Sequence, residues 1–224
     1  MGSAAISVKT EGYMYTVVCF GDTNTWGYDN RSGERLPYGE RWTGILAHEL
    51  GDDFRIIEEG QPGRATTEDP VEPGKNAKKY IGPCLESHEP VDVFVMMLGQ
   101  PDLKKRFSLT ACDISMGIEV LAKIVLTSNA GPEHRPPKLL IISPVQVGVV
   151  AGSPMENWFP SVGTSERSAQ LPALYKRIAD KYGAGFLEAS TVAATAEDAI
   201  HIDNGSHKAF ACAVAEKIRK LLEI

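Results

Sequence analysis

The sequence predicts one α/β domain, a three-layer α/β/α sandwich with a flavodoxin-like five-stranded parallel sheet. Three observations support this fold class. The length of 224 residues suits a single compact domain. Short apolar runs alternate along the chain with stretches of helical periodicity, and most of these runs are apolar on both faces, as in strands buried between helices. Strands that alternate with helices imply right-handed crossovers and therefore a parallel sheet.

Five apolar runs are the expected strands. The first run, YTVVCF, ends at Gly21, and the third, VDVFVMML, ends at Gly99. In open α/β sheets the ligand lies beyond the carboxyl ends of the strands, so the loops that follow these runs are the candidate site. The expected strands cover residues 15–20, 55–58, 91–98, 138–143 and 185–187.

Helices are expected between these strands, because apolar residues recur there at helical spacing. Gly51 is the expected stop of the first helix. Pro172 lies within another apolar stripe, so that helix either begins there or is kinked. The expected helices cover residues 42–50, 114–125, 171–178 and 210–221, with a less regular helix over 75–85.

The composition is that of an ordinary globular protein, with 43% hydrophobic and 23% charged residues. A net charge of −6 argues against a nucleic-acid partner. The sequence contains no run of eighteen apolar residues, so a membrane-spanning helix is not expected. Four separated cysteines without a C-x-x-C pair favour a reduced, cytoplasmic protein. Residues 1–14 lack an apolar signal region and are expected to be a leader or cloning remnant, leaving one domain over 15–224.

Four loop segments carry residues that could take part in catalysis. Thr23 follows the first strand, where a hydroxyl at a strand-to-helix turn projects above the sheet. Gly63 follows the second strand, and its lack of a Cβ permits close approach of a backbone donor to a substrate oxygen. His201 comes three residues after Asp198, a pairing that suits a base and its orienting carboxylate. The segments are 21–27 (GDTNTWG), 58–64 (EEGQPGR), 98–102 (LGQPD) and 198–201 (DAIH).

In order and approximate spacing, these segments resemble the blocks of the GDSL/SGNH hydrolase superfamily. The motifs are most similar to those of its small arylesterase and acyltransferase branch, where G-D-S-x-T-W-G, R-W, E-E-G, M-L-G-T-N-D and D-G-x-H recur. Residues 41–42, 58–60 and 97–99 match that branch, and the likeness runs from about Tyr15 to the end of the chain.

The resemblance implies a hydrolase or acyltransferase that acts on small acyl or aryl esters. Thr23 occupies the nucleophile position, His201 the base position and Asp198 the position that orients the base. The backbone N–H groups of Gly63 and Thr23 would stabilise the oxyanion. The resemblance further implies a small-molecule ester substrate, no metal or organic cofactor, and homo-oligomers of the kind that relatives often form.

The sequence departs from the family pattern at the reacting positions. Thr23 replaces the nucleophilic serine, and Pro101 replaces an asparagine whose side chain donates to the oxyanion. Gln100, beside it, is expected to bring its amide near the vacated donor position. Asp22 and Trp26 flank the nucleophile and are expected to contribute to binding, although core packing explains a tryptophan there equally well. The alternative function is a weakened or redirected relative that binds a carbonyl- or carboxylate-bearing molecule.

A metal site is the less favoured interpretation of the C-terminal histidines. Asp198, His201, Asp203 and His207 lie close in sequence, but no further partner has suitable local spacing. His207 is instead expected on the surface of the last helix. His88 has no motif around it and is expected to be structural or solvated.

Overall fold

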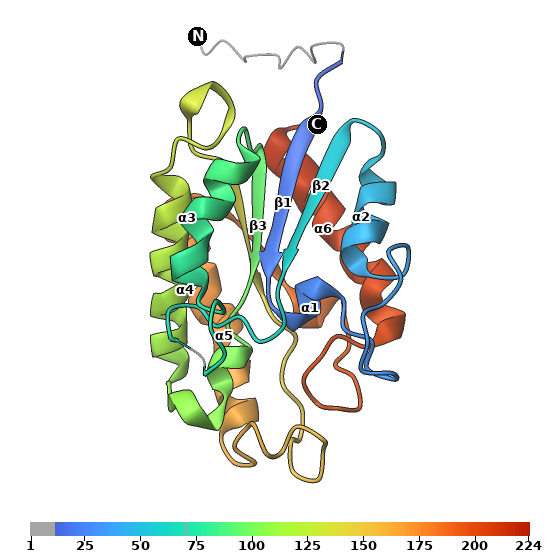
Figure 1. Ribbon diagram of the computed structural model, residues 1–224, viewed down its shortest axis with the longest axis vertical. Helices are drawn as coiled ribbons and strands as arrows, with labels where there is room; N and C mark the ends of the chain where they lie inside the picture. The colour runs from blue at the N-terminus through green and yellow to red at the C-terminus, as the bar shows by residue number, and fades with distance from the viewer. Residues whose placement is uncertain (1–11, 70) are drawn as a thin grey trace.

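A computed structural model describes residues 12–69 and 71–224 of the protein. Its five strands form one parallel sheet in the order β2-β1-β3-β4-β5, so the predicted flavodoxin-like sheet is confirmed (Figure 1). The strand bounds differ from the expected ones by at most two residues. The strands are β1 (Tyr15–Gly21), β2 (Phe54–Gly60), β3 (Val93–Met97), β4 (Lys138–Ser143) and β5 (Gly185–Glu188).

Helices cover both faces of the sheet (Figure 1). Helices α3, α4 and α5 pack on one face, and α2 and α6 pack together on the other. The apolar side chains of β1 alternate between these two cores, because successive residues of a strand point to opposite faces. The helices are α1 (Thr23–Trp26), α2 (Trp42–Leu50), α3 (Ala77–His88), α4 (Ala111–Leu126), α5 (Thr164–Tyr182) and α6 (His207–Leu222).

Helix α5 differs most from the expectation, because it begins at Thr164 and carries Pro172 in its interior. The interpretation that the helix starts at the proline is therefore wrong. Its first turns, TSERSAQ, are mostly polar and carry no apolar stripe from which a helix could be predicted. Helix α3 also contains a proline, Pro83, and its cap Asn76 accepts a hydrogen bond from the Lys79 N–H at 3.4 Å.

Most of the predicted leader, residues 1–11, lies outside the described residues. Tyr13, by contrast, contacts the domain, since its hydroxyl donates to Asp92 Oδ1 at 2.7 Å. All four cysteines are free thiols. In the part of the chain that the structure describes, no helix has the length and apolarity to cross a membrane.

The carboxyl ends of β1, β2 and β3 are in register, where Gly21 lies beside Gly60 and Met97. Helix α1 begins directly after β1 and crosses this edge with almost no clearance. A Cβ on Gly21 would lie 2.0 Å from Thr25 Oγ1, and one on Gly60 would lie 2.2 Å from the backbone nitrogen of Trp26. These two glycines therefore allow α1 to lie against the strand ends, which places Thr23 at the sheet edge.

Candidate active site

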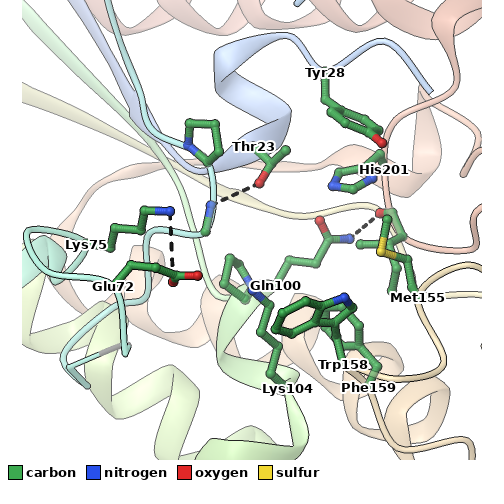
Figure 2. A pocket seen from close by; sticks show the side chains of 14 residues that line it. Thr23, Tyr28, Glu72, Lys75, Gln100, Lys104, Met155, Trp158, Phe159 and His201 are labelled. Atoms are coloured by element: carbon green, nitrogen blue, oxygen red, sulfur yellow. Dashed lines mark hydrogen bonds and ion pairs between the residues drawn. The ribbon is translucent and has the colours of Figure 1, made fainter. Parts of the chain in front are cut away.

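Thr23 is the first residue of α1, and its hydroxyl faces the loop that follows β2. The backbone N–H of Gly63 donates to Thr23 Oγ1 at 3.1 Å (Figure 2). Gly63 has a φ of 76°, a left-handed conformation that a residue with a side chain rarely adopts. Glycine adopts this conformation readily, so Gly63 can direct its backbone N–H toward the Thr23 hydroxyl.

Asp198 and His201 form a buried, closely bonded pair. Asp198 Oδ2 lies 2.6 Å from His201 Nδ1, and Oδ1 accepts the backbone N–H groups of Ile200 and His201, each at 2.9 Å. Burial raises the pKa of Asp198, but the hydrogen bonds and charge of His201 outweigh it and the net pKa is lowered. An ionised carboxylate only accepts hydrogen bonds, so the Nδ1 of His201 carries a proton and a neutral ring keeps its lone pair on Nε2.

One cavity of about 240 Å³ brings the sequence-predicted residues together. Thr23, Gly63, Gln100, Pro101 and His201 all line it, and Figure 2 shows His201 facing the space beside Thr23. The ring of Tyr28 packs on the other side of the imidazole, with ring centroids 4.3 Å apart. The remaining lining residues are Pro62, Glu72, Lys75, Lys104, Met155, Trp158, Phe159 and Ile200.

Gln100 lines this cavity and connects three segments around it by hydrogen bonds. Its Oε1 accepts from Asn24 Nδ2 at 2.5 Å, and its Nε2 donates to the carbonyl oxygens of Ile200 at 2.5 Å and Val145 at 3.5 Å. The amide N–H groups are therefore taken up by backbone carbonyls, contrary to the expectation that they replace the missing oxyanion donor. The long side chain fits because Asn24, one residue after the predicted nucleophile, holds its other end.

Asp22 and Trp26 do not line the cavity, which corrects their assignment to binding. Asp22 is buried beneath α1 and caps it, accepting the Asn24 N–H at 3.0 Å; burial raises its pKa to about 6. Trp26 lies outside the cavity, where the guanidinium carbon of Arg35 is 5.5 Å from the centroid of the Trp26 ring. Trp42 is fully buried against Phe210, so it belongs to the core.

The R-W and E-E-G blocks act in the scaffold that holds the nucleophile loop. Arg41 Nε and Nη2 donate to the two oxygens of Glu58 at 2.5 and 2.6 Å, and Thr43 Oγ1 also donates to this carboxylate. Burial raises the pKa of Glu58, but Arg41 and Thr43 overcome it and leave the pKa lowered. This bidentate pair links the start of α2 to β2, which ends at the cavity.

His207 is buried, which corrects its predicted place on the helix surface. Its Nδ1 accepts the backbone N–H of Trp42 at 3.0 Å, and burial lowers its pKa to about 4. This ring is turned toward α2 rather than toward His201, so the histidine–aspartate metal cluster is not assembled. A different set, Glu59, Cys84 and His88, brings three ligand atoms within 4.8 Å of one another outside the cavity.

Within that set His88 already has a partner, because its Nε2 lies 2.7 Å from Glu59 Oε1. Burial raises the pKa of the Cys84 thiol to about 12, which opposes the thiolate that a metal requires. The set therefore offers suitable ligand atoms for a metal cation, but the protonated Cys84 thiol and the His88–Glu59 contact disfavour metal binding.

Several cavity residues were missed by sequence reasoning. Lys75 and Lys104 come from the loops after β2 and β3, and Trp158 and Phe159 come from the long segment between β4 and α5. Lys75 begins the helix expected over 75–85, and the other three lie outside every block and every stretch of helical spacing. The only available signal was general: loops at the carboxyl ends of parallel strands line the site.

No protein-family model matches the chain, and no curated protein matches it. Solved structures do. A carbohydrate acetylesterase family member from Sinorhizobium meliloti is 33% identical, with 94% of this chain and 100% of that chain covered and a TM-score of 0.88. The inhibitor-bound aryl esterase of M. smegmatis is 34% identical over 92% and 99% of the two chains, with a TM-score of 0.85.

A lipolytic protein of the G-D-S-L family from Desulfitobacterium hafniense DCB-2 shares the fold alone, at 11% identity over 90% of this chain and 98% of that chain, with a TM-score of 0.64. The two more similar structures exceed 30% identity over nearly their whole length. Together with the sheet order and the placement of the four sequence blocks, these likenesses show that the chain belongs to the GDSL/SGNH hydrolase family, within its aryl esterase and carbohydrate acetylesterase group.

Proposed function

We propose that the protein hydrolyses small acyl or aryl esters with Thr23 as nucleophile, His201 as base and Asp198 as the group that orients the base. One observation carries this proposal: the Thr23 hydroxyl accepts the Gly63 N–H in the same cavity that His201 lines, and Asp198 bonds to His201 from behind the cavity wall. A nucleophile, an oriented base and an oxyanion donor in one cavity make up an acyl-transfer site. The esterases among the similar structures support the same reaction class.

The proposed reaction has two stages. Thr23 Oγ1 attacks the ester carbonyl carbon while His201 Nε2 takes the hydroxyl proton, and the oxyanion receives the N–H groups of Gly63 and Thr23. Collapse breaks the ester C–O bond, and the departing alcohol takes the proton from His201. Water, deprotonated by the same imidazole, then cleaves the acyl-threonine to release the acid and restore the hydroxyl.

Two features slow this reaction relative to a serine esterase. The methyl group of Thr23 restricts χ1 and crowds the approach to the carbonyl. Pro101 supplies neither a side-chain nor a backbone donor, and loss of one oxyanion donor typically lowers kcat by about 10²–10³. We therefore expect turnover well below that of a family member with the full set of donors.

The second candidate function is binding of a carbonyl- or carboxylate-bearing molecule without turnover. The hydrogen bonds of Gln100 favour it, because the oxygen of its side-chain amide accepts from Asn24 and the nitrogen donates to the Ile200 and Val145 carbonyls. With Pro101 adjacent, no amide side chain on this side of the cavity is free to stabilise an oxyanion. Such a protein would keep the cavity and lose the reaction.

Hydrolysis of p-nitrophenyl acetate separates the two functions. The proposal predicts slow but measurable release of p-nitrophenol that the isosteric Thr23→Val variant abolishes. His134→Ala, at an exposed histidine remote from the motif, is the matched control and should retain the wild-type rate. Equal rates in the wild type and Thr23→Val would remove Thr23 from the reaction and leave the binding function.

A further inference from the structure

Two lysine side chains reach the oxyanion side of the cavity. A Cβ built on Gly63 would lie 3.6 Å from the ammonium nitrogen of Lys75 and 3.9 Å from that of Lys104. Both residues line the cavity, and Figure 2 shows their side chains reaching toward it from separate loops. The Gly63 N–H contacts Thr23 Oγ1, so the two ammonium groups and the Thr23 hydroxyl are neighbours of the same residue. We call Lys75 and Lys104 the lysine pair.

The lysine pair has little negative charge to balance it. Glu72 is 3.9 Å from Lys75, at the long end of an ion pair. Within residues 12–69 and 71–224, no carboxylate oxygen lies within 4.0 Å of the Lys104 ammonium. A third cation, Arg106, lies over the same Trp158 ring as Lys104, at 5.4 and 5.5 Å from its centroid.

The surroundings of Lys104 oppose its charge. Burial lowers its pKa most and the Arg106 and Lys75 charges lower it further, while the Glu72 and Asp22 carboxylates oppose them only in part, so the net pKa is lowered. An anion placed between the lysines would relieve both effects, because opposite charges within a few ångströms favour the ionised forms. In a chain of net charge −6, a concentration of cations beside the nucleophile is a local feature that a ligand can use.

We propose that the lysine pair binds a carboxylate on the acyl part of the substrate, so that the preferred esters are monoesters of short dicarboxylic acids. This inference rests on the proposed function for the position of the ester carbonyl. With that carbonyl oxygen on the Gly63 N–H, a carboxylate between the two ammonium groups is roughly two or three carbon atoms away, at about 1.5 Å per bond. A succinyl group has this length.

The remaining surfaces of the cavity suit the rest of such a substrate. Met155 and Phe159 offer apolar contact for the alcohol part, while the lysine pair contacts the acid part. The competing role for the lysines is to stabilise the oxyanion itself. That role raises kcat for all esters alike, whereas carboxylate binding changes affinity for anionic esters only.

The test compares monoethyl succinate with ethyl succinamate, its neutral amide analogue of similar shape, in calorimetric binding to Thr23→Val, which cannot turn either over by the proposed route. The anion should bind at least about 10-fold more tightly, as expected for a charge-assisted hydrogen bond. Lys104→Met should reduce this preference to below about 3-fold, and Lys75→Met should weaken it in the same direction. Lys208→Met, at an exposed lysine of α6, is the control and should leave the preference unchanged.

Equal affinity for the two compounds, or an unchanged preference in Lys104→Met, would overturn the inference. Hydrolysis by the wild type is measured on the same pair of compounds. Selective binding without turnover rejects the proposed esterase function and retains the anion site. Turnover of both esters with equal KM, and a fall in kcat for both in Lys104→Met, rejects the anion site and retains the esterase.

Discussion

The two sides of the cavity differ in how closely they follow the family pattern. On the base side, Asp198 holds His201 through three hydrogen bonds, one to its ring and two to the turn that carries it. On the oxyanion side, Thr23 and Pro101 depart from the pattern, and two lysines outside the family blocks line the cavity beside Gly63. The base is thus built by local contacts within one turn, whereas the oxyanion side is assembled from separate loops.

The largest expected effect concerns the base side. His201→Ala should lower kcat for p-nitrophenyl acetate by about 10²–10⁴, because the proposed mechanism assigns the hydroxyl proton to this imidazole. Asp198→Ala should lower kcat less, since its role is to orient the ring. Steady-state kinetics of both variants test this order. Full activity in His201→Ala would assign the hydrolysis to a different site.

A smaller effect, of opposite sign, is expected on the oxyanion side. Thr23→Ser removes the crowding methyl group, and Pro101→Asn returns a side-chain donor worth about 10²–10³ in kcat elsewhere. The double variant should exceed either single variant, without simple additivity, because both changes act on one transition state. An inert double variant with a wild-type melting temperature would show that this scaffold has lost more than two residues of the reaction.

The smallest effect concerns the stability of the folded protein and involves the buried His207. Burial lowers the pKa of His207 to about 4, so the unfolded chain binds a proton here near pH 6.5 before the folded one does. Stability from this group is therefore complete above pH 6.5 and is lost as the pH falls toward about 4. His207→Gln, which keeps an acceptor for the Trp42 N–H, should flatten the denaturant-midpoint profile between these pH values. An identical profile would locate the acid sensitivity in another group.

The fold was predictable because its signals are local. Each strand is a short apolar run; Gly21 is the last residue of β1 and Gly99 lies two residues after β3, so these glycines mark where two of the strands end. The polar first half of α5 differs most from the pattern, while Pro172 lies inside the helix, as one of the two alternatives for it had allowed. Resemblance to the family also located the residues of the cavity from four separate loops.

The finer assignments at the site depended on geometry that no pattern contains. Gln100 resembles a free donor in sequence, but Asn24 and two carbonyls hold it. His207 has the spacing of a surface residue, yet it turns inward because the Trp42 N–H at the start of α2 requires an acceptor. The lysine pair lies far apart in sequence and meets only because loops after β2 and β3 end at one sheet edge.

Covalent trapping of the acyl-enzyme tests the nucleophile most directly. The protein is mixed with p-nitrophenyl acetate, quenched in acid within the first turnover, digested and examined by tandem mass spectrometry. The account predicts a 1:1 acetyl adduct on the Thr23 hydroxyl, which Thr23→Val lacks and which His201→Ala forms far more slowly. Ester hydrolysis at the wild-type rate, with no adduct on Thr23 or with the acetyl group on a lysine such as Lys75, would contradict a threonine nucleophile.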